Sequence, residues 1–163
     1  MENTVEKSKA EASDIIQTAD LNSLGHLFGG RLVSMIDKVA AISAIRHVRG
    51  PVVTLSIDSL VFKKPVTNGS IVTLKAAVNR VFKHSLEVGV IVHTLPHGAT
   101  EELHVCSAYL TFVALDLTGK PCLVQDVIPE TEEEKRRYEQ AMIRRNHRLN
   151  LQTQLGKPPK AST

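Results

Sequence analysis

The segment 22–47 holds the residues whose types and spacing could act on a carbonyl group. Gly29 and Gly30 stand just before an apolar helical pattern, so the first turn of the predicted helix would present free backbone N–H groups. Such donors can stabilise a carbonyl oxygen as it gains negative charge. Asp37 lies within the apolar pattern, where an ionised carboxylate must find a partner, face water or take part in chemistry. Asn22 adds an amide that could hold the carbonyl or a water molecule.

The spacing of these groups limits what one chain can do with them. Asp37 follows Gly30 by seven residues, which is about 10 Å along a helix axis at 1.5 Å per residue. The two groups therefore reach one carbonyl only if the substrate spans them or if a second copy of the chain supplies the missing half. Two ordinary interpretations stay open. Glycines before a helix are often simple turn residues, and Asp37 could pair with a lysine or a backbone group.

The element that carries Asp37 is predicted to be a single long helix. Its apolar residues recur with the helical period from about Gly30 onward and occupy most sides, which is typical of a buried helix. The pair Gly50 and Pro51 ends it.

The rest of the chain reads mainly as β-structure. A short strand is predicted over 13–19, and longer ones over 52–61, 71–81, 85–95 and 104–115. Short connections without helices favour adjacent antiparallel pairing. Alternation in 85–95 places Leu86 and Val88 inward, with Glu87 outward, and a loss of phase near Ser59 and Leu60 predicts a bulge. The sequence therefore predicts an α+β fold in which an antiparallel sheet of about five or six strands wraps the helix.

The two ends of the chain are predicted to lie outside this unit. Thr131 and Glu134 fit a capping box that opens a second helix, expected on the surface or against another subunit. We expect a domain over 13–128, a C-terminal helix over 129–150, and flexible tails over 1–12 and 151–163.

Composition excludes several classes of protein. The net charge of +3 is too small to indicate nucleic-acid binding by itself. The sequence has no apolar run long enough to cross a bilayer, and its polar, acidic start does not read as a signal peptide, so we expect a cytoplasmic protein. The two cysteines and seven histidines lack metal-ligand spacing. Serine-hydrolase and phosphate-loop motifs are absent, so we expect no metal and no cofactor.

Five blocks of sequence carry a more specific resemblance. They are Asn22-x-x-Gly25-x-x-Phe28-Gly29-Gly30, Met35-Ile36-Asp37, Val53-Thr54-Leu55-Ser56-Ile57-Asp58, Phe62-x-x-Pro65-Val66 and Thr111-Phe112-Val113-Ala114-Leu115-Asp116. In this order they resemble the acyl-CoA thioesterases of the hotdog superfamily, especially the brain acyl-CoA hydrolase type and its small bacterial relatives. The resemblance spans about residues 13–148.

The resemblance implies a hydrolase of lipid metabolism that splits acyl-CoA into CoA and a carboxylic acid. It implies a long helix wrapped by an antiparallel sheet, and a dimer that often assembles into a hexamer. Carried over, Asn22 of one chain faces Asp37 of the other, with the Gly30 N–H polarising the carbonyl. Asp37 would be the general base or the nucleophile.

The resemblance also implies a route for CoA. Gly29, Thr54 and Ser56 would line the substrate path, and a strand-to-strand turn would approach the nucleotide. In the family this turn reads G-R-[ST]-S, whereas here it reads Phe82-Lys83-His84-Ser85, so Lys83 replaces a bidentate arginine. Two further phosphate contacts are expected in the last helix, from Arg144 and Arg145.

Three other functions stay open. A hotdog dehydratase or hydratase would need a catalytic histidine, for which His26 is the candidate. A non-catalytic acyl-CoA-binding module would bind without turnover, although no helix-turn-helix of a DNA-binding sensor is evident. Nucleic-acid binding by the basic last helix is disfavoured by the adjacent acidic cluster over 130–134.

Overall fold

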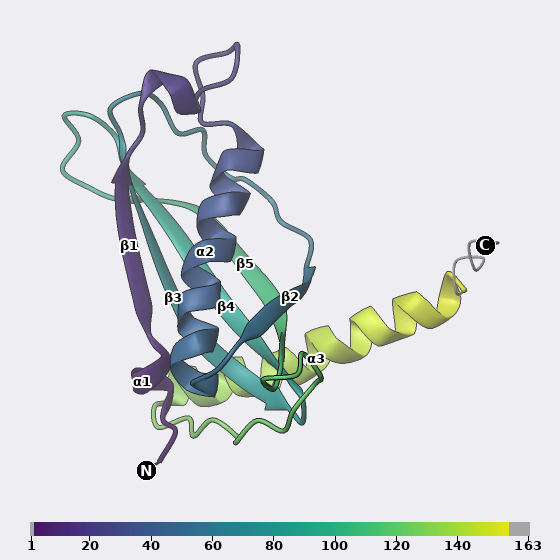
Figure 1. Cartoon of the computed structure of the whole chain (residues 1–163). Helices are drawn as coiled ribbons and strands as arrows, with labels where there is room; N and C mark the ends of the chain where they lie inside the picture. The colour runs from purple at the N-terminus through teal and green to yellow at the C-terminus, as the bar shows by residue number, and fades with distance from the viewer. Residues whose placement is uncertain (1, 157–163) are drawn as a thin grey trace.

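A computed structural model describes residues 2–156 of the chain (Figure 1). One long helix, α2 (Gly29–Val48), lies against a five-stranded antiparallel sheet. The strands are β1 (Ala10–Ile15), β2 (Val52–Ile57), β3 (Ile71–Phe82), β4 (Ser85–Leu95) and β5 (Leu103–Ala114), in the spatial order β1-β3-β4-β5-β2. We call the face toward α2 the inner face and the opposite one the outer face. The predicted α+β architecture is confirmed.

The core lies between α2 and the inner face of the sheet. Leu86, Val88, Val90 and Val92 of β4 are buried there, as their alternation predicts. The helix contributes Leu32, Ile36, Val39, Ala40 and Ala44 to the same core. Burying each of the larger side chains stabilises the fold by about 1.5–3 kcal/mol. The helix ends at Val48, and Arg49, whose φ is 58°, turns the chain before Gly50 and Pro51.

The sheet curls around α2 as predicted, and one side of the helix remains uncovered within residues 2–156. Ile42 and Ile45 on α2 are 45% and 47% exposed. On the neighbouring strand β2, Leu55 is 65% exposed. Because β2 is the last strand in the sheet order, its outer edge has no strand beside it within residues 2–156. The uncovered apolar surface therefore continues from α2 onto an open sheet edge.

The predicted bulge near Ser59 and Leu60 was wrong. The register between β2 and β5 shifts between Thr54 and Ser56, and β2 ends at Ile57. The apolar residues that follow suggested more strand, but this segment meets β5 only through single backbone hydrogen bonds, such as the one from Lys63 N to Val105 O at 2.8 Å.

The expectation of a flexible tail over residues 1–12 was also wrong. A short helix, α1 (Val5–Ser8), buries Val5, and the hydroxyl of Ser8 accepts a hydrogen bond from Val78 N at 3.0 Å. The first strand begins at Ala10 and not near residue 13, and residues 18–20 form a 3₁₀ turn. The β-branched run after Ser13 favoured the later start, but pairing with β3 decides the strand.

The second helix, α3 (Glu132–Gln154), begins with the predicted capping box between Thr131 and Glu134. It extends four residues beyond the predicted end at 150, and it crosses the outer face of the sheet (Figure 1). Part of the tail predicted over 151–163, residues 157–163, lies outside the described residues. The division into a 13–128 domain and a separate helix stays a prediction. No helix within residues 2–156 is long and apolar enough to cross a membrane.

Candidate active site

Asp37 lies half-buried in the middle of α2, beside the edge strand β2. The hydroxyl of Thr54 donates a hydrogen bond to Asp37 Oδ1 at 2.8 Å. No ion pair to Asp37 is formed within residues 2–156, and its second carboxylate oxygen accepts no hydrogen bond from them. The lysine partner that sequence reasoning left open is therefore not seen. The carboxylate is oriented by a neutral donor and retains free lone pairs.

Asn22 is held by the loop that precedes α2. Its Oδ1 accepts hydrogen bonds from Leu24 N at 2.9 Å and His26 N at 3.1 Å. Gly25 between them has a φ of 76°, a conformation that favours glycine. These contacts engage only the oxygen of the amide. The Asn22 NH₂ group makes no hydrogen bond within residues 2–156 and is free to donate to a substrate.

The N-terminus of α2 offers further donors. Phe28 at the cap has no capping side chain, and its carbonyl accepts from Arg31 N and Leu32 N. The N–H groups of Gly29 and Gly30 find no acceptor within the described chain. A side chain at Gly29 would place its Cβ 3.3 Å from the ring of Phe62, so glycine suits this close approach.

A cavity of about 300 Å³ brings part of the predicted site together. Asn22, His26 and Gly29 line it, with Phe62 and Lys63 from the segment after β2. Asp37 and Thr54 do not line it. The separation expected from the sequence is therefore present in the structure. Asn22 lies with the N-terminus of α2, whereas Asp37 lies with Thr54 outside the cavity.

Ser56 lies on the other face of the sheet from Asp37. It pairs directly with Thr111, which in turn pairs with Glu87 on the face that α3 covers. The hydroxyls of Ser56 and Thr111 are buried and find no partner in the described chain. The structure thus does not bring Ser56 and Thr54 into one path.

The predicted nucleotide contacts gather at the hairpin between β3 and β4. Lys83 is exposed in this turn with a φ of 64°. The guanidinium of Arg145 lies 4.6 Å from the centroid of the Phe82 ring, next to Lys83 in sequence. Ser85 makes only a long contact of 3.5 Å to the Phe82 carbonyl. Lys83 therefore lies in the hairpin itself, and Arg145 reaches the same hairpin from α3.

Arg144 is engaged elsewhere, in an ion pair that sequence reasoning missed. It donates to Glu87 at 2.7 and 3.1 Å, and it stacks 3.6 Å from the centroid of the Tyr109 ring. Glu87 is fully buried and also accepts from Asn79 at 2.9 Å. It points outward as predicted, but α3 covers it. The expected phosphate contact from Arg144 is thus replaced by a contact that holds α3 on the sheet.

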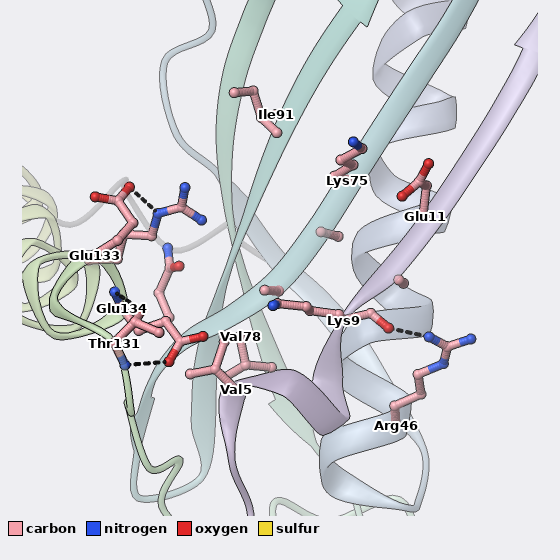
Figure 2. A pocket seen from close by; sticks show the side chains of 15 residues that line it. Val5, Lys9, Glu11, Arg46, Lys75, Val78, Ile91, Thr131, Glu133 and Glu134 are labelled. Carbon is pink, nitrogen blue, oxygen red and sulfur yellow. Dashed lines mark hydrogen bonds and ion pairs between the residues drawn. The ribbon is translucent and has the colours of Figure 1, made fainter.

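A further cavity, of about 690 Å³, is lined by none of the predicted site residues (Figure 2). It is bounded by β1, β3 and the first turns of α3. Its charged lining mixes both signs, with Lys9, Lys75 and Arg137 near Glu11 and Glu133. Arg136 and Arg137 hold the pKa of Glu133 at about 2. No group of three or more metal-binding side chains occurs within residues 2–156.

Comparison with known proteins identifies the family. The sequence profile of the thioesterase superfamily matches residues 24–100. Acyl-CoA thioester hydrolase YkhA of Bacillus subtilis is 43% identical over 145 residues, which cover 88% of this chain and 84% of that protein. The chain belongs to the acyl-CoA thioester hydrolases.

Solved structures of thioesterases share the whole architecture. Acyl-CoA hydrolase from Staphylococcus aureus, solved with butyryl-CoA and CoA, superimposes with a TM-score of 0.86 at 35% identity and covers 95% of this chain and 96% of its own. A hexameric hotdog-fold thioesterase of Campylobacter jejuni gives a TM-score of 0.64 at 33% identity and covers 78% and 94%. The hotdog fold and the enzyme class implied by the sequence blocks are thereby confirmed.

Proposed function

We propose that this acyl-CoA thioester hydrolase forms its active site between two protomers. One protomer supplies Asn22 and the N–H groups of Gly29 and Gly30. The other supplies Asp37 with Thr54. The observation that carries this proposal is the separation of the two half-sites within one chain, each with unused hydrogen-bonding capacity.

The uncovered surface of α2 and β2 supports a two-fold dimer of this kind. The open edge of β2 can pair with the same edge of a second copy, which satisfies its backbone groups. Ile42, Ile45 and Leu55 would then leave water, which is the main favourable term in association. Ala41 is a small residue on α2 that permits close approach of two helices. We further infer a trimer of such dimers, in line with the hexameric relative.

The chemistry follows from the groups in the joined site. The thioester carbonyl oxygen accepts hydrogen bonds from the Gly30 N–H and the Asn22 amide, which stabilise the oxyanion of the tetrahedral intermediate. Asp37 either removes a proton from the attacking water or attacks the carbonyl carbon itself. The C–S bond then breaks, and the CoA thiolate leaves and takes a proton. If water is the nucleophile, this step releases the carboxylic acid. If Asp37 is the nucleophile, it leaves an acyl-aspartyl anhydride, which water then hydrolyses to the carboxylic acid and free Asp37. No cofactor enters this scheme.

The relative from Staphylococcus aureus supports the choice of residues. Its structures include three separate variants in which an asparagine, an aspartate or a threonine is replaced by alanine. These positions are 15 and 17 residues apart, and the same intervals separate Asn22, Asp37 and Thr54 in this chain. In this chain two of these positions, Thr54 and Asp37, are joined by a hydrogen bond.

For the phosphates of CoA we propose Lys83 and Arg145. Both are cations at the β3–β4 hairpin, and neither forms an ion pair within residues 2–156. Lys83 would bind a phosphate as a point charge, without the fork of an arginine. Arg144 is not assigned to this role because Glu87 already occupies its guanidinium.

Release of free thiol from acetyl-, butyryl-, octanoyl- and palmitoyl-CoA tests the activity and ranks the acyl chains. We expect hydrolysis of at least one substrate, and a loss of kcat of about 100-fold or more in Asp37→Ala with the fold intact. Single-turnover hydrolysis in ¹⁸O water tests for a nucleophile, because label enters the Asp37 carboxylate only when water opens an acyl-aspartyl anhydride at the aspartyl carbon. Tight CoA binding without turnover would contradict the proposal.

A further inference from the structure

The face of α3 that packs on the sheet has well-defined contacts in the first two thirds of the helix. Ala141 is fully buried there. Arg144 pairs with Glu87 on β4, and Arg148 donates to Asp58 at 2.8 Å. Asp58 directly follows β2, the edge strand. The last contact of α3 with its own sheet is therefore at the sheet's open edge.

Within residues 2–156, the same face continues beyond this contact with its apolar side chains exposed. A helix turns by 100° per residue, so the residues three and seven positions after Arg148 lie on the same side as Arg148, which faces the sheet. They are Leu151 and Leu155, which are 45% and 77% exposed. Figure 1 shows α3 running on past β2, away from the rest of the chain. We call residues 149–155 the overhang.

The length of the overhang matches the width of two strands. From Arg148 to Leu155 a helix advances about 10 Å, and neighbouring strands are about 4.8 Å apart. A sheet that continued across the edge of β2 would therefore place two more strands under the overhang. In the dimer proposed above, these are β2 and β5 of the second copy.

The outer face of those two strands carries an apolar patch at the required position. Val53 pairs directly with Val113, and Val113 is two residues after Thr111 on the face that α3 covers. Val53 is 46% exposed, and Val113 is half-buried. In the proposed dimer the two copies of β2 run antiparallel about a two-fold axis at the middle of the strand. The end of one copy, where Asp58 lies, is then next to the start of the other copy, where Val53 lies.

We propose that the overhang of each protomer packs on the outer face of its partner's sheet, with Leu151 and Leu155 over Val53 and Val113 of the partner protomer. Each C-terminal helix then holds both sheets of the dimer. The occupant is a second copy of this chain, because only the paired β2 edge continues the sheet in the direction of the helix. The inference rests on the proposed β2-joined dimer.

Disulfide trapping between differently tagged, co-expressed chains tests the contact. One chain carries Leu151→Cys and the other carries Val53→Cys, both in a Cys122→Ser background, while Cys106 stays because it is buried. A matched control pairs Leu151→Cys with Lys75→Cys, an exposed position on β3. We expect a mild oxidant to link the first pair of chains and not the control pair.

Three results would overturn the inference: co-purified dimers that do not link, a preferred link to Lys75→Cys, or no dimer at all. The readout does not depend on catalysis, so loss of thioesterase activity with the link intact would refute only the proposed function. A second variant that ends at Arg148 should raise the dimer dissociation constant at least tenfold in sedimentation analysis. A variant that ends at Gly156 should not.

Discussion

Thr54 Oγ1 donates a hydrogen bond of 2.8 Å to Asp37 Oδ1, and so connects the middle of α2 to the open edge of the sheet. The two residues stand 17 positions apart and reach each other because Gly50 and Pro51 turn the chain back along the helix. The bond leaves Asp37 Oδ2 free and fixes the direction in which it points. A second protomer that packs against α2 and β2 would therefore face the carboxylate of Asp37 in a fixed orientation.

Replacing Thr54 with valine should impair catalysis without disturbing the fold. Valine keeps the shape of the side chain but removes the donor, and a hydrogen bond to a charged group contributes about 1.5–3 kcal/mol. We expect kcat to fall by about tenfold or more, measured by thiol release. Thr54→Ser retains the hydroxyl and should keep most of the activity. Equal losses in the two variants would show that the hydrogen bond is not the cause.

Asn22 allows its structural and catalytic roles to be separated. Asn22→Asp keeps an oxygen that can accept from Leu24 N and His26 N, but it loses the NH₂ donor. We expect this variant to keep the wild-type melting temperature and to lose about 100-fold in kcat. Asn22→Ala should lose both stability and activity. If Asn22→Asp remains fully active, the amide does not hold the thioester carbonyl.

The buried pair of Glu87 and Arg144 should govern stability. Arg144→Met leaves the carboxylate of Glu87 without its charged partner in a fully buried position, which typically costs about 3–5 kcal/mol. We expect a matching decrease in the free energy of unfolding in urea at fixed protein concentration. The double variant Arg144→Met/Glu87→Gln should recover part of this loss. A change of less than about 1 kcal/mol in the single variant would contradict this role.

Stability should fall as the solution becomes mildly acidic. Burial lowers the pKa of His47 from its ordinary 6.5, although its ring N–H donates to the Gln125 carbonyl. The unfolded chain therefore binds this proton more readily, so the free energy of unfolding decreases as pH falls from about 6.5 toward the folded pKa. His104, whose pKa burial also lowers, acts in the same direction.

His47→Gln isolates the first of these contributions. Glutamine can still donate to the Gln125 carbonyl but does not titrate, so the variant should lose less stability between pH 7 and pH 5 than the wild type. Urea unfolding at several pH values measures the slope. Identical slopes in the two proteins would rule out His47 as the source.

Much of the fold could be predicted where local signals and tertiary pairing agree. The strand β4 has the bounds expected from its alternation and from the turns on either side. The helix α2 begins at Gly29 and ends at Val48, close to the Gly50-Pro51 pair that the sequence marks. The spacing of Gly30 and Asp37 predicts that one chain cannot bring both to one carbonyl, and in the structure Asp37 does not line the cavity that Asn22 and Gly29 line.

Features decided by distant pairing could not be predicted. The start of β1 depends on β3, since Ala10 pairs with Ala76, and its own sequence gives little β-signal. Glu87 reads as a solvent-exposed residue in an alternating strand, and only the position of α3 shows that Arg144 neutralises it. The resemblance placed Ser56 and Thr54 on one substrate path, but the register shift between them puts Ser56 on the other face of the sheet.

Complementation between two inactive variants tests the shared active site most directly. Asp37→Ala chains and Asn22→Ala chains are each expected to be inactive alone. When they are co-expressed with different tags, a mixed dimer has one site with both native residues and one site with neither. Random pairing of equal amounts should restore about a quarter of the wild-type activity, because half of the dimers are mixed and one of their two sites is intact. Activity that stays at the level of the separate variants, with mixed dimers present, would contradict an active site built from two protomers.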